Sequence, residues 1–256
     1  MRRIFVGLGT VLAASLAPAA SAHDFFLLPV QFSDDARGPV AIQATVGSSF
    51  PKPETVVTAD RVEQLTAMGN GEPTVRVAGA GPAALNLEVA GATPGLLVTG
   101  VGTKARDVDY AEDRIPLILG EYRVLPGAAA AVEALSKPRT WQVVSRRFAK
   151  TFVCVASCTD RSAADRSFGA HLEFVGSRSS ADHFRLLAHG KPLTNYPIDL
   201  VGSDGARQHL TTDAQGDIHL PAGDRGAMML FAAKLEPPTG AGRFTLDLTS
   251  LTFSRP

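Results

Sequence analysis

The sequence predicts a mainly β protein, with two antiparallel β-sandwiches joined by a short helical region. Short apolar runs recur along the chain, and many of them alternate apolar and polar residues, which is the two-residue period of a half-buried strand. The 24 glycines and 17 prolines are spread between these runs, as the turns of such a fold require. One alanine-rich stretch, at residues 128–135, interrupts the strand pattern. This combination is typical of immunoglobulin-like or transthyretin-like sandwiches.

The first 22 residues have the pattern of an export signal. A basic head, Arg2-Arg3, precedes an apolar run, and Ala20-Ser21-Ala22 supplies the small residues that a signal peptidase recognises. A retained anchor is the weaker alternative, because the run is shorter than the roughly 20 residues of a membrane span. Twin-arginine signals also carry an arginine pair, but the residues around this one favour an ordinary basic head. We expect cleavage after residues 1–22, a periplasmic protein without a membrane span, and His23 as its first residue.

The mature chain has 234 residues and almost balanced charge. Without Arg2 and Arg3 it carries 23 basic and 25 acidic side chains. This length is enough for one large domain or two modest ones. Because no basic excess is present, we expect no nucleic-acid partner.

We expect a first sandwich over residues 23–105. Residues 40–46, 74–77 and 84–89 alternate, and residues 95–101 are apolar almost throughout, as in a strand buried on both faces.

A mixed connecting region is expected over residues 106–182. Its alanine-rich stretch predicts a helix that Pro138 stops, and residues 141–150 are predicted to begin as a helix and to pass into a strand at 151–153.

The second sandwich is expected over residues 183–256. Turns such as Asp204-Gly205 and residues 213–216 separate its strands. The predicted strands cover residues 184–188, 197–201, 208–212, 217–220, 227–235 and 244–248.

Two cysteines, Cys154 and Cys158, are four residues apart. In an extended chain they would lie roughly 13 Å from each other, too far for a disulfide, so a bond requires a turn after Val155. The spacing fits neither redox pairs nor the usual zinc sites. In an oxidising compartment we expect a short structural disulfide that stabilises the fold modestly.

Several segments carry a common pattern: AHDFFLLP at 22–29, RFAKTFV at 147–153, HLEFV at 171–175, FRLLAHGKPL at 184–193 and TDAQG at 212–216. Together they resemble a bacterial periplasmic family of unknown function whose members are found beside nickel and cobalt uptake components. The chain departs from that family in having Phe26 where tryptophan is common, in its cysteine pair, and in lacking a histidine near residues 232–234. The resemblance implies metal-ion transport.

A free amino-terminal His23 would be a metal chelate in itself. Its amine and imidazole have ordinary pKa values of ~7.7 to 8.0 and ~6.5, so nickel(II) or copper(II) can displace their protons near neutral pH. Cleavage after Ala20 would instead create a Ser21-Ala22-His23 chelate, but it would put Pro18 at a recognised position. The alternative is that His23 binds no metal and is a solvent-exposed residue that the export cleavage site merely tolerates.

Further ligands are harder to assign. His209 and His219 are predicted to pair across a hairpin centred on residues 213–216, which makes them additional candidates. His183 and His189 would lie ~20 Å apart on one extended strand, too far to share a metal.

Catalytic patterns are missing from the sequence. Residues 202–205 lack the spacing of a nucleophile elbow, and no zinc-binding helix or phosphate loop occurs. We therefore expect no enzyme; a hydrolase or a copper oxygenase built on His23 ranks third.

The first expectation is a periplasmic metal-binding accessory protein for uptake or delivery of nickel, cobalt or copper, with an envelope metal transporter as partner. The second is a non-catalytic module that binds a carbohydrate or an envelope protein.

Overall fold

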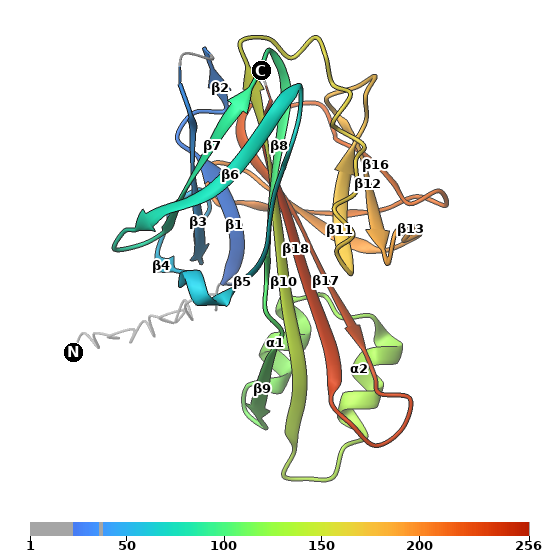
Figure 1. Cartoon of the computed structure of the whole chain (residues 1–256). Helices are drawn as coiled ribbons and strands as arrows, with labels where there is room; N and C mark the ends of the chain where they lie inside the picture. The colour runs from blue at the N-terminus through green and yellow to red at the C-terminus, as the bar shows by residue number, and fades with distance from the viewer. Residues whose placement is uncertain (1–22, 36–37, 256) are drawn as a thin grey trace, which may run out of the picture.

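The computed structural model describes residues 23–35 and 38–255. The predicted export signal lies outside these residues. The described chain forms three sheets, two short helices and one 3-10 turn (Figure 1). None of the described helices is long and apolar enough to cross a membrane.

The first sheet has the order β1-β3-β7-β6, and β4 pairs with β3. All of its strands come from the amino-terminal part of the chain, and neighbouring strands are antiparallel. Their bounds are β1 (Asp24–Pro29), β3 (Val40–Gly47), β4 (Thr55–Val56), β6 (Gly71–Ala80) and β7 (Leu85–Ala92).

The second sheet has nine strands and contains strands from both ends of the chain, in the order β15-β14-β17-β18-β10-β8-β5, with β2 and β9 also paired to β10. It therefore joins the two predicted sandwich regions through one continuous sheet. Two of its pairings, β10 with β18 and β10 with β2, are parallel. The bounds are β2 (Ser33–Asp34), β5 (Val62–Met68), β8 (Gly95–Thr103), β9 (Arg106–Ala111), β10 (Thr140–Val155), β14 (Pro197–Val201), β15 (Arg207–Thr211), β17 (Gly226–Glu236) and β18 (Phe244–Arg255).

The third sheet is small and antiparallel, with β12 paired to β11, β13 and β16. Its bounds are β11 (Leu172–Gly176), β12 (His183–Ala188), β13 (Lys191–Pro192) and β16 (Asp217–His219). Figure 1 shows this sheet and the first sheet on opposite sides of the long strands β10 and β18.

Strand β10 lies between the layers and contributes to a core on each face. Phe148 and Phe152 pack with the third sheet, whereas Ala149 and Val153 pack with the first. Side chains alternate between the faces of a strand, so one strand can serve both cores.

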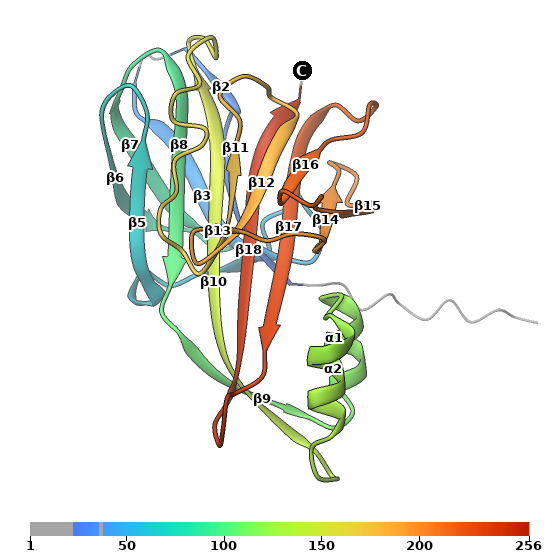
Figure 2. The same cartoon turned by 90° about the vertical axis from the view of Figure 1, so that its right-hand side faces the viewer.

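The lower ends of β10, β17 and β18 extend past both outer sheets, where two helices cover them (Figure 2). These are α1 (Ile115–Glu121) and α2 (Pro126–Glu133), which enclose Trp141 and Phe231 of the long strands. The 3-10 turn η1 (Ala59–Arg61) precedes β5.

The predicted fold class is confirmed: the chain is mainly β, its sheets pack as sandwiches, and helices occur in the connecting region. The prediction of a helical start at residues 141–150 is wrong, because the whole of 140–155 is strand β10. Residues 143–151 pair with β18 over nine positions. Helix α2 coincides with the alanine-rich stretch, whereas α1, with only seven residues, was not predicted.

Candidate functional site

His23 is exposed and immediately precedes β1. Its carbonyl oxygen accepts a hydrogen bond from Nη1 of Arg147 at 3.4 Å. Two carboxylates are within its electrostatic reach. Burial raises the pKa of Glu121, and the charges of Arg207 and His23 oppose that shift. Hydrogen bonds from Ser48 lower the pKa of Glu54, and His23 adds a smaller effect in the same direction.

The next residue, Asp24, is buried and anchors the start of β1. Its Oδ2 forms an ion pair with Nη2 of Arg207, which lies on β15. Its Oδ1 is buried and has no hydrogen-bond partner in residues 23–35 and 38–255. Burial raises the pKa of Asp24 to about 7, although Arg207 acts against this shift. The first residues of β1 are thus held to a strand from the other end of the chain.

Asp199 of β14 continues this polar network. Its carboxylate is almost completely buried and accepts hydrogen bonds from three side chains: Nη1 of Arg207 at 3.1 Å, Nη1 of Arg123 at 3.1 Å and Nδ1 of His209 at 2.8 Å. Arg123 also donates to the carbonyl oxygen of Ile198 at 2.8 Å. Asp24, Arg207, Asp199 and His209 therefore form one chain of contacts, which we call the Asp24–His209 network.

The imidazole of His209 is oriented by this network. Its side chain is 61% exposed, while Nδ1 is held by Asp199. Among the described residues, Nε2 has no hydrogen-bond partner. A carboxylate that fixes one ring nitrogen leaves the other available as a ligand, which is the usual arrangement around metal-binding histidines.

His219 lies in a different sheet from His209. β15, which carries His209, pairs with β14, whereas β16, which carries His219, pairs with β12. The expected cross-hairpin pair does not form, because the turn at 213–216 connects two sheets instead of two neighbours in one sheet. His219 instead stacks on His183, with ring centroids 4.4 Å apart.

The other histidines form a second ring pair. His171 and His189 have centroids 4.8 Å apart. His183, the first residue of β12, and His189, which follows the strand, thus have separate partners. Across the described chain, no group of three or more His, Cys, Asp or Glu side chains is arranged to hold a metal ion.

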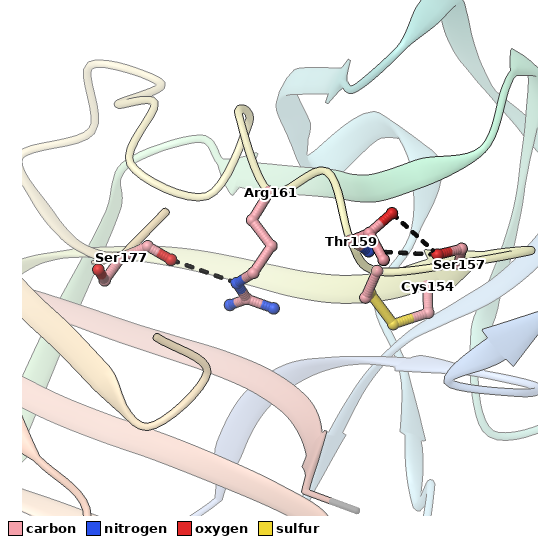
Figure 3. Close-up of a disulfide and its surroundings, with 6 residues drawn as sticks. Cys154, Ser157, Thr159, Arg161 and Ser177 are labelled. Carbon is pink, nitrogen blue, oxygen red and sulfur yellow. Dashed lines mark hydrogen bonds between the residues drawn. A yellow bond between two sulfur atoms is a disulfide. The ribbon is translucent and has the colours of Figure 1, made fainter. Parts of the chain in front are cut away.

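Cys154 and Cys158 form a disulfide (Figure 3). Strand β10 ends at Val155, and Ala156 adopts a positive φ of 55°, which turns the chain and brings the two Cα atoms to 5.1 Å. Beyond the bond, the amide of Thr159 donates to Oγ of Ser157 at 3.3 Å. The disulfide closes a short loop at the end of β10.

Sequence reasoning missed the Asp24–His209 network. Asp24 and Arg207 are 183 positions apart, and neither lies in a local pattern that predicts a pair. The one usable signal was the resemblance of the segment at 22–29, which contains Asp24, to the opening of a known family.

Comparisons with known proteins give a family but no activity. No curated protein matches the sequence. Among solved structures, the D0-D1 domain of intimin aligns with 90% of this chain and 97% of its own chain, at 13% identity and a TM-score of 0.25. That likeness is too slight to bear on function. The model of a family described as "Domain of unknown function (DUF4198)" matches residues 20–235. The chain therefore belongs to the DUF4198 family.

Proposed function

We propose that this protein is a periplasmic metal-binding accessory protein that takes part in uptake or delivery of nickel, cobalt or copper, with an envelope metal transporter as its partner. The metal is its cargo, and the amine and imidazole of a processed His23 are the primary ligands. The observation that carries the proposal is the anchoring of the exposed His23. Arg147 holds its carbonyl oxygen, and Arg207 holds the side chain of the following Asp24.

Anchoring matters because a chelate on a mobile terminus loses conformational freedom when it binds a metal. Here the carbonyl group of His23 and the side chain of the following Asp24 are already tied to β10 and β15. The carboxylates of Glu54 and Glu121 lie within its electrostatic reach and add negative charge where a cation would bind. Amine and imidazole nitrogens suit the late first-row metals, especially nickel(II) and copper(II).

His209 is the second candidate ligand. It belongs to the same network as Asp24, and its Nδ1 is fixed by Asp199 at 2.8 Å. His219 is a weaker candidate, because its ring stacks on His183 in another sheet. Since no three side chains of the described chain form a metal site, the proposal requires the terminal amine, which exists only after cleavage.

The test is calorimetric titration of correctly processed protein with nickel, cobalt and copper salts, after mass spectrometry has identified its first residue. We expect one-to-one binding by protein that begins at His23. Replacing His23 by alanine at the processed terminus removes the imidazole of the chelate but keeps the terminal amine, and should weaken binding at least tenfold. His209→Ala should also weaken it, whereas His189→Ala is a control outside the network. No binding by the processed protein would refute the proposal.

The second candidate is a non-catalytic module that binds a carbohydrate or an envelope protein. It is favoured by β6, a ten-residue edge strand of the first sheet with mostly exposed or half-exposed side chains. Exposed edges can accept an extra strand from a partner. If metals fail to bind, loss of partner binding after a Val75→Pro substitution within β6 would support this candidate.

A further inference from the structure

A cavity of about 330 Å³ lies between the first sheet and the β9–β10 pair. Its size is within the usual range of small-ligand pockets. Part of its wall is apolar, formed by Phe25, Val46, Val56, Val57 and Val108. The remaining wall is polar or cationic, so the cavity differs from a void inside a hydrophobic core.

Three arginines line this cavity: Arg61 from η1, Arg106 from β9 and Arg147 from β10. The lining includes no aspartate or glutamate. Arg61 donates to the carbonyl oxygen of Lys104 at 3.1 Å, and Arg147 donates to that of His23. Within the described residues none of the three forms a salt bridge. Three positive charges therefore line one cavity whose wall carries no negative charge.

Two other pockets of this protein each contain an arginine with an acidic partner in the same wall. On the pocket lined by His171, Arg146 lies 3.5 Å from Asp247. In the pocket beside the third sheet, Arg178 pairs with Asp165 at 2.8 Å. The whole chain has 25 basic and 25 acidic residues, so an unbalanced cluster is not a consequence of composition. Like charges in one cavity repel each other, and a bound anion would remove that repulsion.

Hydroxyl groups complete the polar side of the cavity. Thr55, Thr58, Ser145 and Tyr110 all line it. Burial raises the pKa of Tyr110, so its phenol stays protonated and can donate a hydrogen bond at neutral pH. Guanidinium groups and hydroxyl donors recognise carboxylate and phosphate oxygens, and the apolar wall matches a hydrocarbon or aromatic body.

We propose that this cavity binds a small organic oxyanion, in which a carboxylate or phosphate group is attached to an apolar body. The arginines Arg61, Arg106 and Arg147 hold the oxyanion, and the valines and Phe25 contact the apolar part. This site shares Arg147 with the anchoring of His23, but none of its cationic residues is a proposed metal ligand, so anion binding can be tested separately from metal binding.

The protein offers an internal probe for the test. Trp141 is its one tryptophan, and its ring lies 5.2 Å from that of Tyr110, which lines the cavity. We would strip the processed protein of metal with EDTA and then dialyse the EDTA away, because this polycarboxylate would compete for the site. The metal-free protein is titrated with phenylacetate, phenyl phosphate and inorganic phosphate, while Trp141 fluorescence and heat are followed. Because no metal is present, failure here is distinguishable from failure of metal binding.

We expect phenylacetate or phenyl phosphate to bind, more weakly at high salt, and the tighter one identifies the headgroup. Arg106→Gln and Arg61→Gln should each weaken binding at least tenfold, while Arg114→Gln, an exposed arginine outside the cavity, should not. Arg106 is exposed and has no ion pair in the described chain, so its replacement should leave the fold intact by circular dichroism. Absence of binding to both organic anions, equal binding by Arg106→Gln, or equally tight binding of inorganic phosphate would overturn the proposal.

Discussion

Lys150 and Glu173 form an ion pair in the interior, with Nζ 2.7 Å from Oε2 and side chains only 1% and 0% exposed. Lys150 also donates to the carbonyl oxygen of Phe174 at 3.0 Å. Glu173 accepts hydrogen bonds from the backbone amides of Phe168 and Gly169 at 3.0 and 3.2 Å. The pair thereby fastens the segment before β11 to the central strand β10.

Removing one partner of this pair should destabilise the protein strongly. Lys150→Met leaves a buried carboxylate without its counter-charge, and we expect a loss of ~3–5 kcal/mol in the free energy of unfolding. Urea unfolding of Lys150→Met, Glu173→Gln and the double variant measures the coupling. The double variant should lose less than the sum of the single losses, because it leaves no buried charge unpaired. Strictly additive losses would show that the pair is not coupled.

Acid should weaken the contact between Glu112 and Arg139. Hydrogen bonds from the Arg139 side chain and amide lower the pKa of Glu112 to about 2, against 4.5 for the free side chain. A lowered carboxyl pKa stabilises the fold above pH 4.5, and the contribution is lost as the pH falls from 4.5 towards 2. Glu112→Gln should therefore be less stable than the wild type at pH 7, and the difference should shrink between pH 5 and 3.

The control for this prediction is Glu63→Gln, an exposed residue of β5. Thermal unfolding across the same pH series should show no such convergence for that variant. A difference in stability between wild type and Glu112→Gln that stays constant at all pH values would contradict the lowered pKa of Glu112.

The disulfide should make a modest contribution to stability. Cys154 and Cys158 close a loop with a sequence separation of four, and chain-entropy arguments give about 2 kcal/mol for a loop of this size. The double variant Cys154→Ser/Cys158→Ser should lose about that amount in urea unfolding. Treatment with a reductant should lower the stability of the wild type but not that of the double variant; sensitivity of both would point to another cause.

Two glycines offer a matched test of packing. A Cβ at Gly100 would overlap Cδ2 and Cε2 of the Phe168 ring, whereas a Cβ at Gly127 would meet no atom within 4 Å. Gly100→Ala should cost ~1–3 kcal/mol, since the aromatic ring must move. Gly127→Ala, inside α2, should instead stabilise the protein by ~0.5–1 kcal/mol, because alanine lowers the conformational entropy of the unfolded chain. Chemical denaturation of both variants checks the opposite signs.

The sequence by itself determined most of the strands. The predicted segments at 184–188, 197–201 and 227–235 coincide with β12, β14 and β17, because short apolar runs between turn residues mark buried strands. The turn after Val155 could also be anticipated, since a disulfide between residues four positions apart requires it.

Only the tertiary structure decided which strands are neighbours. Residues 141–150 are strand rather than helix because they lie between packed layers and pair with β18 from the end of the chain. His209 contacts Asp199 instead of His219, and Asp24 meets Arg207 across 183 positions. The three arginines of the cavity come from three separate elements. The pattern that marks a strand lies in consecutive residues. Which strands become neighbours depends on burial and hydrogen bonding across the whole chain, so a short segment does not reveal it.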